Sequence, residues 1–174
     1  LHGGGSNGKS KFTAMIQHIL GDYAGTANPT AFMSKSPNAI RNDIARLSGY
    51  RAVFASEIRD KHVLDEALIK RLTGEDPIVA RFLHQEEFEY VPTYKVWLTG
   101  NYKPTIESAD HAIWRRPLLI PFEQRFWKDD DPEHEKGDAK YKADKHIDDK
   151  LFKQVEGVLR WAVEGCMLWQ SQGL

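Results

Sequence analysis

The first ten residues contain residue types and a spacing suited to binding phosphate. They include a complete G-x-x-x-x-G-K-[ST] pattern, which consists of Gly3, Gly4, Gly5, Ser6, Asn7, Gly8, Lys9 and Ser10. The glycines of such a loop let backbone N–H groups wrap around a phosphate chain, while the lysine reaches the β- and γ-phosphates and the serine hydroxyl ligates Mg²⁺. The pattern therefore predicts a nucleoside triphosphate, most simply ATP, that is bound together with Mg²⁺.

The residues after this loop have the spacing of an amphipathic helix that ends at Gly21. Its apolar positions, at i, i+3, i+4 and i+7, are Phe12, Met15, Ile16 and Ile19. The positive end of the helix dipole would add to the attraction for phosphate. A loop of this kind normally follows a buried strand, of which only Leu1 and His2 are present. We therefore expect a piece of a longer protein, cut near the central strand of its sheet.

Length and composition favour one α/β domain with a proper hydrophobic core, since 41% of the 174 residues are hydrophobic. With 24 basic and 25 acidic residues, any contact with nucleic acid must come from a local patch. The single cysteine, Cys166, lies among apolar residues and is predicted to be a buried structural thiol, which suits a reducing cytoplasm. No apolar run is long enough to span a membrane, and the histidines lack the spacing of zinc ligands.

The rest of the chain reads as alternating helices and strands. We expect a loop over 22–37, a helix capped by Asn38 that carries Ile40, Ile44 and Leu47 and ends at Gly49, and a buried parallel strand over 52–55. Further expected elements are a helix over 65–72, a hairpin with arms 78–83 and 88–91, and strands over 94–99 and 118–122. The stretch 147–169 has apolar residues at helical spacing and predicts a C-terminal helix, over 151–170, that packs on the core. Residues 128–150, with nine acids and six lysines, read as a solvated, mobile segment.

Three polar positions at the ends of these elements could complete a hydrolytic site. Such a site needs a carboxylate that positions water, a polar group near the γ-phosphate and a cation that meets the developing charge. Glu57 and Asn101 each follow an apolar strand, and Arg115 and Arg116 precede another. A guanidinium supplied by a neighbouring subunit is one way to meet that charge.

The order of these features resembles the superfamily-3 helicases, a branch of the AAA+ ATPases, and most of all the helicase domain of phage and plasmid primases and of poxvirus-type primase-helicases. The resemblance covers almost the whole chain. It rests on the glycine-rich loop, the run from Asp65 to Gly74, Asp76 with Arg81, Thr99-Gly100-Asn101, Trp114-Arg115-Arg116, and the closing stretch from Glu156 to Gly165.

This resemblance implies a three-layer α/β P-loop NTPase with a mainly parallel sheet and a β-hairpin insertion, truncated at its N-terminus. It further implies that Lys9 holds phosphate, Ser10 and Glu57 hold Mg²⁺, Glu57 activates water, and Asn101 acts as sensor. Arg116, with Arg115 in reserve, would reach into the next subunit of a ring, usually a hexamer. Single-stranded or forked DNA, a primase domain upstream in the same chain and a cytoplasmic location are implied as well.

Two departures from that family pattern bear on the mechanism. Ser56 precedes Glu57 where many members carry two adjacent acids, so catalysis would depend on one carboxylate. The hairpin tip offers His84 and Gln85 beside Glu86 and Glu87, and these acids would repel DNA phosphates. The candidates for DNA contact are therefore Lys70, Arg81 and His84, together with Lys61.

Two other functions remain open from the sequence alone. A small-molecule kinase would use the same loop with residues 128–150 as a lid, although the acidic excess there opposes an anionic second substrate. A nucleotide-regulated oligomerisation module would bind the triphosphate without unwinding DNA. Stimulation of hydrolysis by single-stranded DNA would exclude the first, and turnover of ATP with Mg²⁺ would exclude the second.

Overall fold

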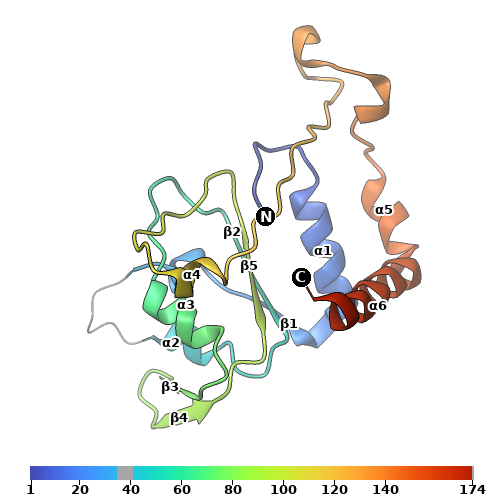
Figure 1. Ribbon diagram of the computed structural model, residues 1–174. Helices are drawn as coiled ribbons and strands as arrows, with labels where there is room; N and C mark the ends of the chain where they lie inside the picture. The colour runs from blue at the N-terminus through green and yellow to red at the C-terminus, as the bar shows by residue number, and fades with distance from the viewer. Residues whose placement is uncertain (35–40, 174) are drawn as a thin grey trace.

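The computed structural model describes residues 1–34 and 41–173, in which helices and strands alternate (Figure 1). The strands are β1 (Ala24–Thr26), β2 (Ala52–Ser56), β3 (Ile78–Arg81), β4 (Glu87–Tyr90) and β5 (Lys95–Thr99). The α-helices are α1 (Lys9–Leu20), α2 (Asn42–Ala45), α3 (Glu66–Leu72), α4 (His111–Trp114), α5 (Ile147–Phe152) and α6 (Val155–Gln172). Short 3₁₀ turns are η1 (Gly21–Tyr23), η2 (Pro29–Phe32), η3 (Glu133–Glu135) and η4 (Ala139–Tyr141).

A three-stranded parallel sheet in the order β1-β2-β5 forms the centre of the fold. The first two residues extend it, because His2 forms parallel bridges to Gly100 on one side and to Pro121 on the other. Gly100 N donates to Leu1 O over 3.1 Å, and Phe122 N donates to His2 O over 2.7 Å. The glycine-rich loop therefore starts at the carboxyl edge of the sheet, between β5 and residues 120–122.

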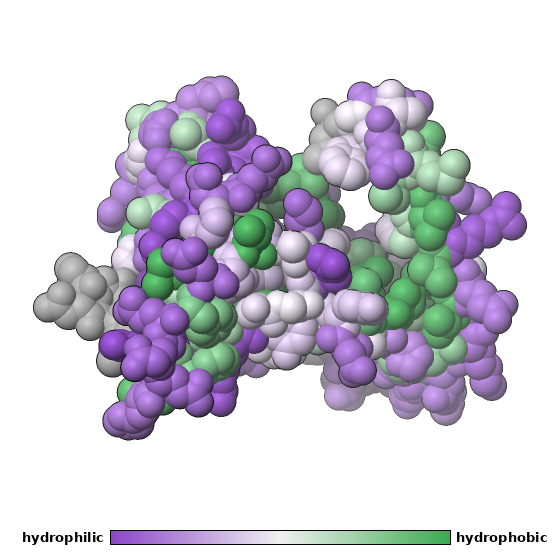
Figure 2. All heavy atoms as spheres, turned by 90° about the horizontal axis from the view of Figure 1, so that it is seen from below, coloured by the Kyte–Doolittle hydropathy of each residue, from purple (hydrophilic) through white to green (hydrophobic). Residues whose placement is uncertain are grey.

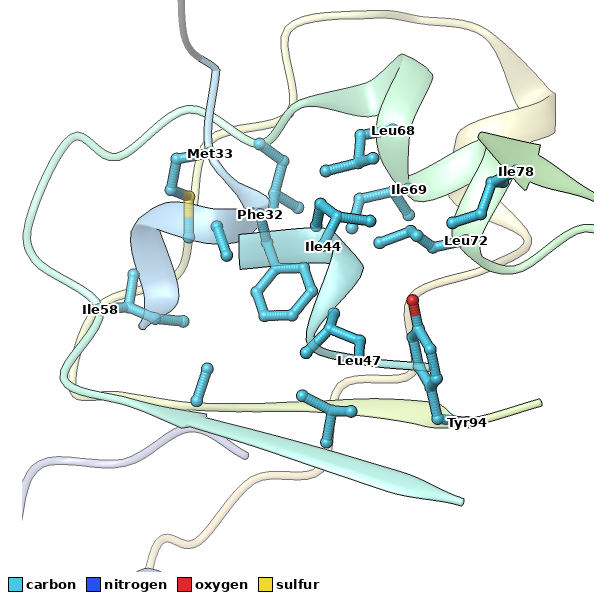
Figure 3. Close-up of a cluster of buried hydrophobic side chains, with 14 of the residues drawn as sticks. Phe32, Met33, Ile44, Leu47, Ile58, Leu68, Ile69, Leu72, Ile78 and Tyr94 are labelled. Atoms are coloured by element: carbon cyan, nitrogen blue, oxygen red, sulfur yellow. The ribbon is translucent and has the colours of Figure 1, made fainter. Parts of the chain in front are cut away.

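Helices lie on both sides of this sheet (Figure 1). On one side, Val53 and Ala55 of β2 belong to a buried cluster with side chains of η2, α2, α3 and α4 (Figure 3). On the other side, Phe54 stacks on Trp97 with ring centroids 5.7 Å apart, and Phe12 of α1 lies 6.0 Å from the same indole. Alternate residues of the buried strand thus serve opposite faces, as the period of a β-strand requires.

The predicted helix over 65–72 is confirmed, with Asp65 as its N-cap. Its carboxylate accepts a hydrogen bond from Leu68 N over 2.9 Å, which satisfies one of the free N–H groups at the helix start. Leu68 and Leu72, one turn apart, are 2% and 1% exposed. Figure 3 shows both side chains among those of the buried cluster.

The predicted hairpin is also confirmed, as β3 and β4 pair antiparallel with Ala80 opposite Phe88. Phe88 stacks on Phe82 at 5.5 Å, and the Tyr90 hydroxyl donates to Ile44 O of α2 over 2.8 Å. The hairpin comes just before β5 in the chain and lies at the bottom of Figure 1. It is therefore near the amino end of the strand whose carboxyl end adjoins the glycine-rich loop.

Two predictions, the loop over 22–37 and the strand over 118–122, are wrong. Residues 22–37 were expected to form a loop, yet they contain β1, which pairs with β2 through Ala24 and Ala52, and η2, which Asn28 caps. A three-residue strand is too short to show a periodic pattern, so only its pairing reveals it. Residues 118–122 are not a strand; within them only Pro121 forms a bridge, to His2. The expected cap at Asn38 lies outside the described residues.

The C-terminal part also differs from expectation. The stretch 147–169 is not one continuous helix, because α5 and α6 are separated at Lys153 and Gln154; α6 covers most of the predicted range 151–170, but none of the described side chains of α5 and α6 is buried. Cys166 is exposed, not buried, because α6 does not pack into the core. Residues 128–150, the charged segment, contain η3, η4 and the start of α5. In the ranges 1–34 and 41–173, no helix has the length and hydrophobicity required to cross a bilayer.

Candidate functional site

The glycine-rich loop adopts the backbone conformations that a phosphate cradle needs. Gly5 and Gly8 have φ angles of 100° and 87°, and Ser6 between them has a φ of 46°. Gly8 is the N-cap of the twelve-residue helix α1, and no side chain caps this helix end. The N–H groups of the first turn thus have no side-chain acceptor at this cap, and such a helix start is suited to an anion.

Residues 122–126 are hydrogen-bonded to the glycine-rich loop. Asn7 Nδ2 donates to Phe122 O over 2.8 Å, and Phe126 N donates to Ser6 O over 2.6 Å. A Cβ atom on Gly3 would overlap both Phe122 O and the Asn7 amide. Gly3 is thus required for this close approach, a packing reason that the loop pattern does not reveal.

Lys9 is buried in the loop, with only 6% of its surface exposed. Its Nζ donates to Gly3 O over 2.6 Å, to Asn7 Oδ1 over 2.9 Å and to Asn101 Oδ1 over 3.3 Å. These acceptors are neutral oxygens, and burial lowers the pKa of the Lys9 ammonium. A desolvated cation that faces neutral dipoles attracts a polyanion strongly, because such a ligand brings the missing countercharge.

The ends of two neighbouring strands bring Glu57 and Asn101 to the same place. Ser56 of β2 lies opposite Thr99 of β5, and Glu57 N donates to Thr99 O over 3.0 Å. Glu57 has a φ of 70°, a left-handed conformation that is uncommon for a non-glycine residue and often found at functional sites. Glu57 and Asn101 thus lie at the same edge of the sheet, and both line one cleft with Lys9 of the loop.

These residues line an open cleft of about 1860 Å³. One wall is the loop with the ends of β2 and β5, and the opposite wall includes the apolar residues Ile147, Leu151, Val158 and Trp161 of α5 and α6. Figure 2 shows the molecule hollowed between its left and right parts. The cleft volume exceeds that of ordinary small-molecule sites, which hold about 300–1,000 Å³.

Phe126 is a wall residue of this cleft that the sequence analysis missed. Its ring lies 4.0 Å from the position a Cβ on Gly8 would occupy, and it meets Tyr141 edge-on at 6.5 Å. An aromatic face beside this glycine-rich loop could stack on a planar base, because every base has a π-face. Only its contact with the loop distinguishes Phe126 from other aromatic residues of the chain.

Arg115 and Arg116 do not line the cleft. Arg116 is half-buried beside α3, where its Nε donates to Thr73 Oγ1 over 2.9 Å and its Nη1 donates to Ala112 O. Arg115 is exposed. Neither arginine is therefore positioned to serve the loop of its own chain in this structure.

The residues predicted to contact DNA occupy three places, and none of them lines the cleft. Lys70 of α3 forms an ion pair with Asp110 that lowers the pKa of this carboxyl group. Arg81 is exposed on β3 opposite Glu87, and His84 is exposed at the hairpin tip. Lys61 is exposed on the loop after β2. The ion pair makes Lys70 a poorer candidate for binding phosphate than the sequence suggested.

Comparison with known proteins assigns the chain to a family. It belongs to DUF5906, which is described as a family of unknown function, and the family model matches residues 1–116. The matched range holds the glycine-rich loop, Glu57, Asn101 and both arginines, whereas Phe126, α5 and α6 lie beyond it.

Several proteins of large DNA viruses are similar to this chain. A protein of Acanthamoeba polyphaga mimivirus named "putative helicase" is 34% identical over 130 residues, which is 74% of this chain and 14% of the relative. A "putative helicase" of Frog virus 3 is 30% identical over 130 residues, or 71% of this chain and 13% of the relative. A "putative primase" of African swine fever virus is 29% identical over 133 residues, which is 75% of this chain and 14% of the relative. The chain spans about one seventh of the length of these relatives.

Proposed function

We propose that this chain is the NTP-hydrolysing part of a DNA helicase of the P-loop, superfamily-3 type, within a viral or phage-like replication primase-helicase. The observation that carries the proposal is the buried Lys9 ammonium in a left-handed glycine loop, hydrogen-bonded to Asn101 and sharing a cleft with Glu57. The names of the viral relatives support the assignment to replication.

The residues present fit a triphosphate with Mg²⁺. The uncapped start of α1 and Lys9 offer donors and positive charge to the phosphates, and Ser10 and Glu57 offer the oxygen ligands that Mg²⁺ prefers. The bound ion would neutralise charge on the phosphate oxygens. On binding, Lys9 would exchange its contacts with Gly3 and Asn101 for phosphate oxygens.

The chain's own side chains would then divide the work of hydrolysis. Glu57 would hold the attacking water and take its proton, as the acid that directly follows β2. Asn101, released by Lys9, would orient that water or contact the γ-phosphate through its amide. Arg116, which lies outside its own cleft, would stabilise the transition state in the next subunit of a hexameric ring, and the β3–β4 hairpin would contact single-stranded DNA.

Substitutions of Lys9 and Glu57 test this division. Lys9→Ala should weaken nucleotide binding and abolish hydrolysis, because the buried cation is lost. Glu57→Gln should leave binding within about twofold while removing turnover, since an amide keeps the shape but takes no proton. Affinity for a fluorescent ATP analogue and phosphate release measure the two effects. Equal loss of binding in both variants would make Glu57 a structural residue.

A mixture of two inactive variants tests the role of Arg116. Arg116→Ala should keep nucleotide affinity and lose about 10³-fold in assembly-dependent hydrolysis. Mixed with Lys9→Ala subunits, it should regain activity at interfaces that join an intact loop to an intact arginine. Mixed rings that form but remain inactive would contradict action in trans. Arg115→Ala is the matched control and should leave more activity than Arg116→Ala.

A nucleotide-binding oligomerisation module remains the second candidate. Ser56 in place of a second acid is the observation that favours it, because one carboxylate alone must then serve both the metal and the water. This candidate predicts tight ATP binding and nucleotide-dependent assembly with no phosphate release from the wild-type protein. Turnover in the presence of Mg²⁺ and single-stranded DNA would exclude it.

A further inference from the structure

One face of α3 holds the chain segment that carries Arg116. Glu66, Lys70 and Thr73 recur at i, i+4 and i+7, which places them in one row along this helix and its C-cap. Each of them contacts residues 107–116. The Glu66 carboxylate accepts hydrogen bonds from the backbone N–H groups of Glu107 and Ser108 over 2.9 Å and 2.8 Å, and Lys70 pairs with Asp110.

Thr73 makes the last of these contacts, and its hydroxyl group is oriented by a second hydrogen bond. Thr73 Oγ1 donates to Ile69 O over 2.6 Å, so its lone pairs are free to accept from Arg116 Nε over 2.9 Å. With Nη1 also donating to Ala112 O, two of the five guanidinium N–H donors fix the group, and the others can meet an anion. The cation also lies at the C-terminal end of α3, where the helix dipole favours it.

Both partners in this contact are anchored in the core. Leu68, Ile69 and Leu72 of α3 belong to the buried cluster, and Ile113 of α4, three residues before Arg116, is fully buried. The Thr73–Arg116 contact therefore joins two rigid elements, although Thr73 itself is exposed.

Thr73 is also the first residue of the connection between α3 and the β3–β4 hairpin. Thr73 is the C-cap of α3, and the chain passes through residues 74–77 directly into β3 at Ile78, which is 4% exposed. β3 in turn packs on α2. A force applied to the hairpin thus reaches the C-terminal end of α3, where Arg116 is held.

We propose that Thr73 is a positioning residue for Arg116 and that α3 links the hairpin to this arginine. DNA held by the hairpin sets the position of the guanidinium through Thr73, so that hydrolysis in the next subunit responds to DNA. This inference rests on the proposed function, in which Arg116 acts in trans.

Thr73→Val tests the link, with Thr73→Ser as the matched control. Valine has the shape of threonine but cannot accept from Arg116, whereas serine keeps the hydroxyl group. In the assembled protein that contains this chain, Thr73→Val should lower kcat about 10- to 100-fold with KM unchanged, as expected for a misplaced catalytic group. It should also reduce the ratio of hydrolysis rates with and without single-stranded DNA. Thr73→Ser should behave like the wild type in both measurements.

A double-mutant cycle separates positioning from a general structural effect. In an Arg116→Ala background, Thr73→Val should cause no further loss of kcat, because the group it positions is gone. A further loss of the same size in that background, or equal damage by Thr73→Ser, would overturn the inference. Fully active Arg116→Ala rings would overturn it together with the trans role of Arg116. A severe Arg116→Ala defect beside an unimpaired Thr73→Val variant would overturn the inference alone.

Discussion

The region around α2, α3 and α4 and the region of α5 and α6 are built differently. The first surrounds a buried cluster in which Phe32 and Ile113 are fully buried and Leu72 is 1% exposed. In the second, Trp161 and Met167 of α6 are 59% and 64% exposed. Figure 2 shows hydrophobic side chains at the surface on the right, the side on which Figure 1 places α5 and α6.

From this difference we infer which region stabilises the fold and where a ligand would bind. Free energy from apolar burial is concentrated on the α2–α4 side of the sheet, so that side holds the strand ends and Arg116 rigidly. The cleft lies at the boundary between the two regions, since its walls come from both. A ligand in the cleft would therefore contact a firm wall on one side and a lightly packed wall on the other.

The largest expected difference between the two regions is in the free energy of unfolding when one leucine of each region is replaced by alanine. Leu72→Ala should lower the free energy of unfolding by about 2–5 kcal/mol, because it leaves a cavity in the cluster. Leu159→Ala on α6, where the side chain is 47% exposed, should change it by less than about 0.5 kcal/mol. Urea denaturation measures both. Comparable losses would show that α6 is packed as firmly as α3.

Two tyrosine hydroxyl groups, one beside the buried cluster and one on η4, give a smaller contrast. The Tyr90 hydroxyl donates to Ile44 O and lies 3.1 Å from the Tyr94 hydroxyl, so Tyr90→Phe leaves both without this partner. We expect a loss of about 1–3 kcal/mol in stability and faster hydrogen exchange in the hairpin. Tyr141→Phe, which keeps the ring contact with Phe126, should cost less than about 0.5 kcal/mol. A larger loss for Tyr141→Phe would contradict the comparison.

The cleft itself can be tested through Phe126, which lies beside the glycine-rich loop. If its ring stacks on a nucleotide base, Phe126→Ala should weaken ATP binding about tenfold, at the lower end of stacking energies. Binding of inorganic tripolyphosphate, which has no base, should not change, and Phe126→Tyr should bind ATP like the wild type. Calorimetry measures all three. An equal loss for tripolyphosphate would assign Phe126 to support of the loop instead.

The smallest expected effect concerns two exposed ion pairs, Lys70 with Asp110 beside α3 and Lys142 with Asp129 in the segment before α5. Lys70 and Lys142 lower the pKa values of Asp110 and Asp129 from the ordinary 3.8. A carboxyl group with a lowered pKa in the folded state contributes stability that is present above pH 3.8 and lost as pH falls through the lowered value. Lys70→Gln and Lys142→Gln should each lower Tm by a degree or so near pH 7, and this difference should shrink as the pH falls below 3.8. A large shift for either, or one that persists in acid, would contradict this account.

Much of the fold can be predicted from local patterns, and the exceptions share a cause. β2, α3, the hairpin and β5 carry apolar spacing or capping residues of their own, so the sequence predicts each of them. β1 has three residues and depends on pairing with β2. Residues 118–122 have strand-like residues but only His2 to pair with, and the exposed Cys166 shows that apolar spacing in α6 does not guarantee burial.

The candidate site divides in the same way. The sequence by itself determined the loop of residues 3–10, the α1 helix behind it, and the positions of Glu57 and Asn101 after apolar strands, because these depend on backbone conformation and on residues near in the chain. Only the tertiary structure decided that Phe126 lies on the loop, that Lys70 pairs with Asp110 and that Thr73 holds Arg116. Those contacts join segments that are 40 or more residues apart, and which of the many exposed polar and aromatic groups meet is set by the packing of whole elements.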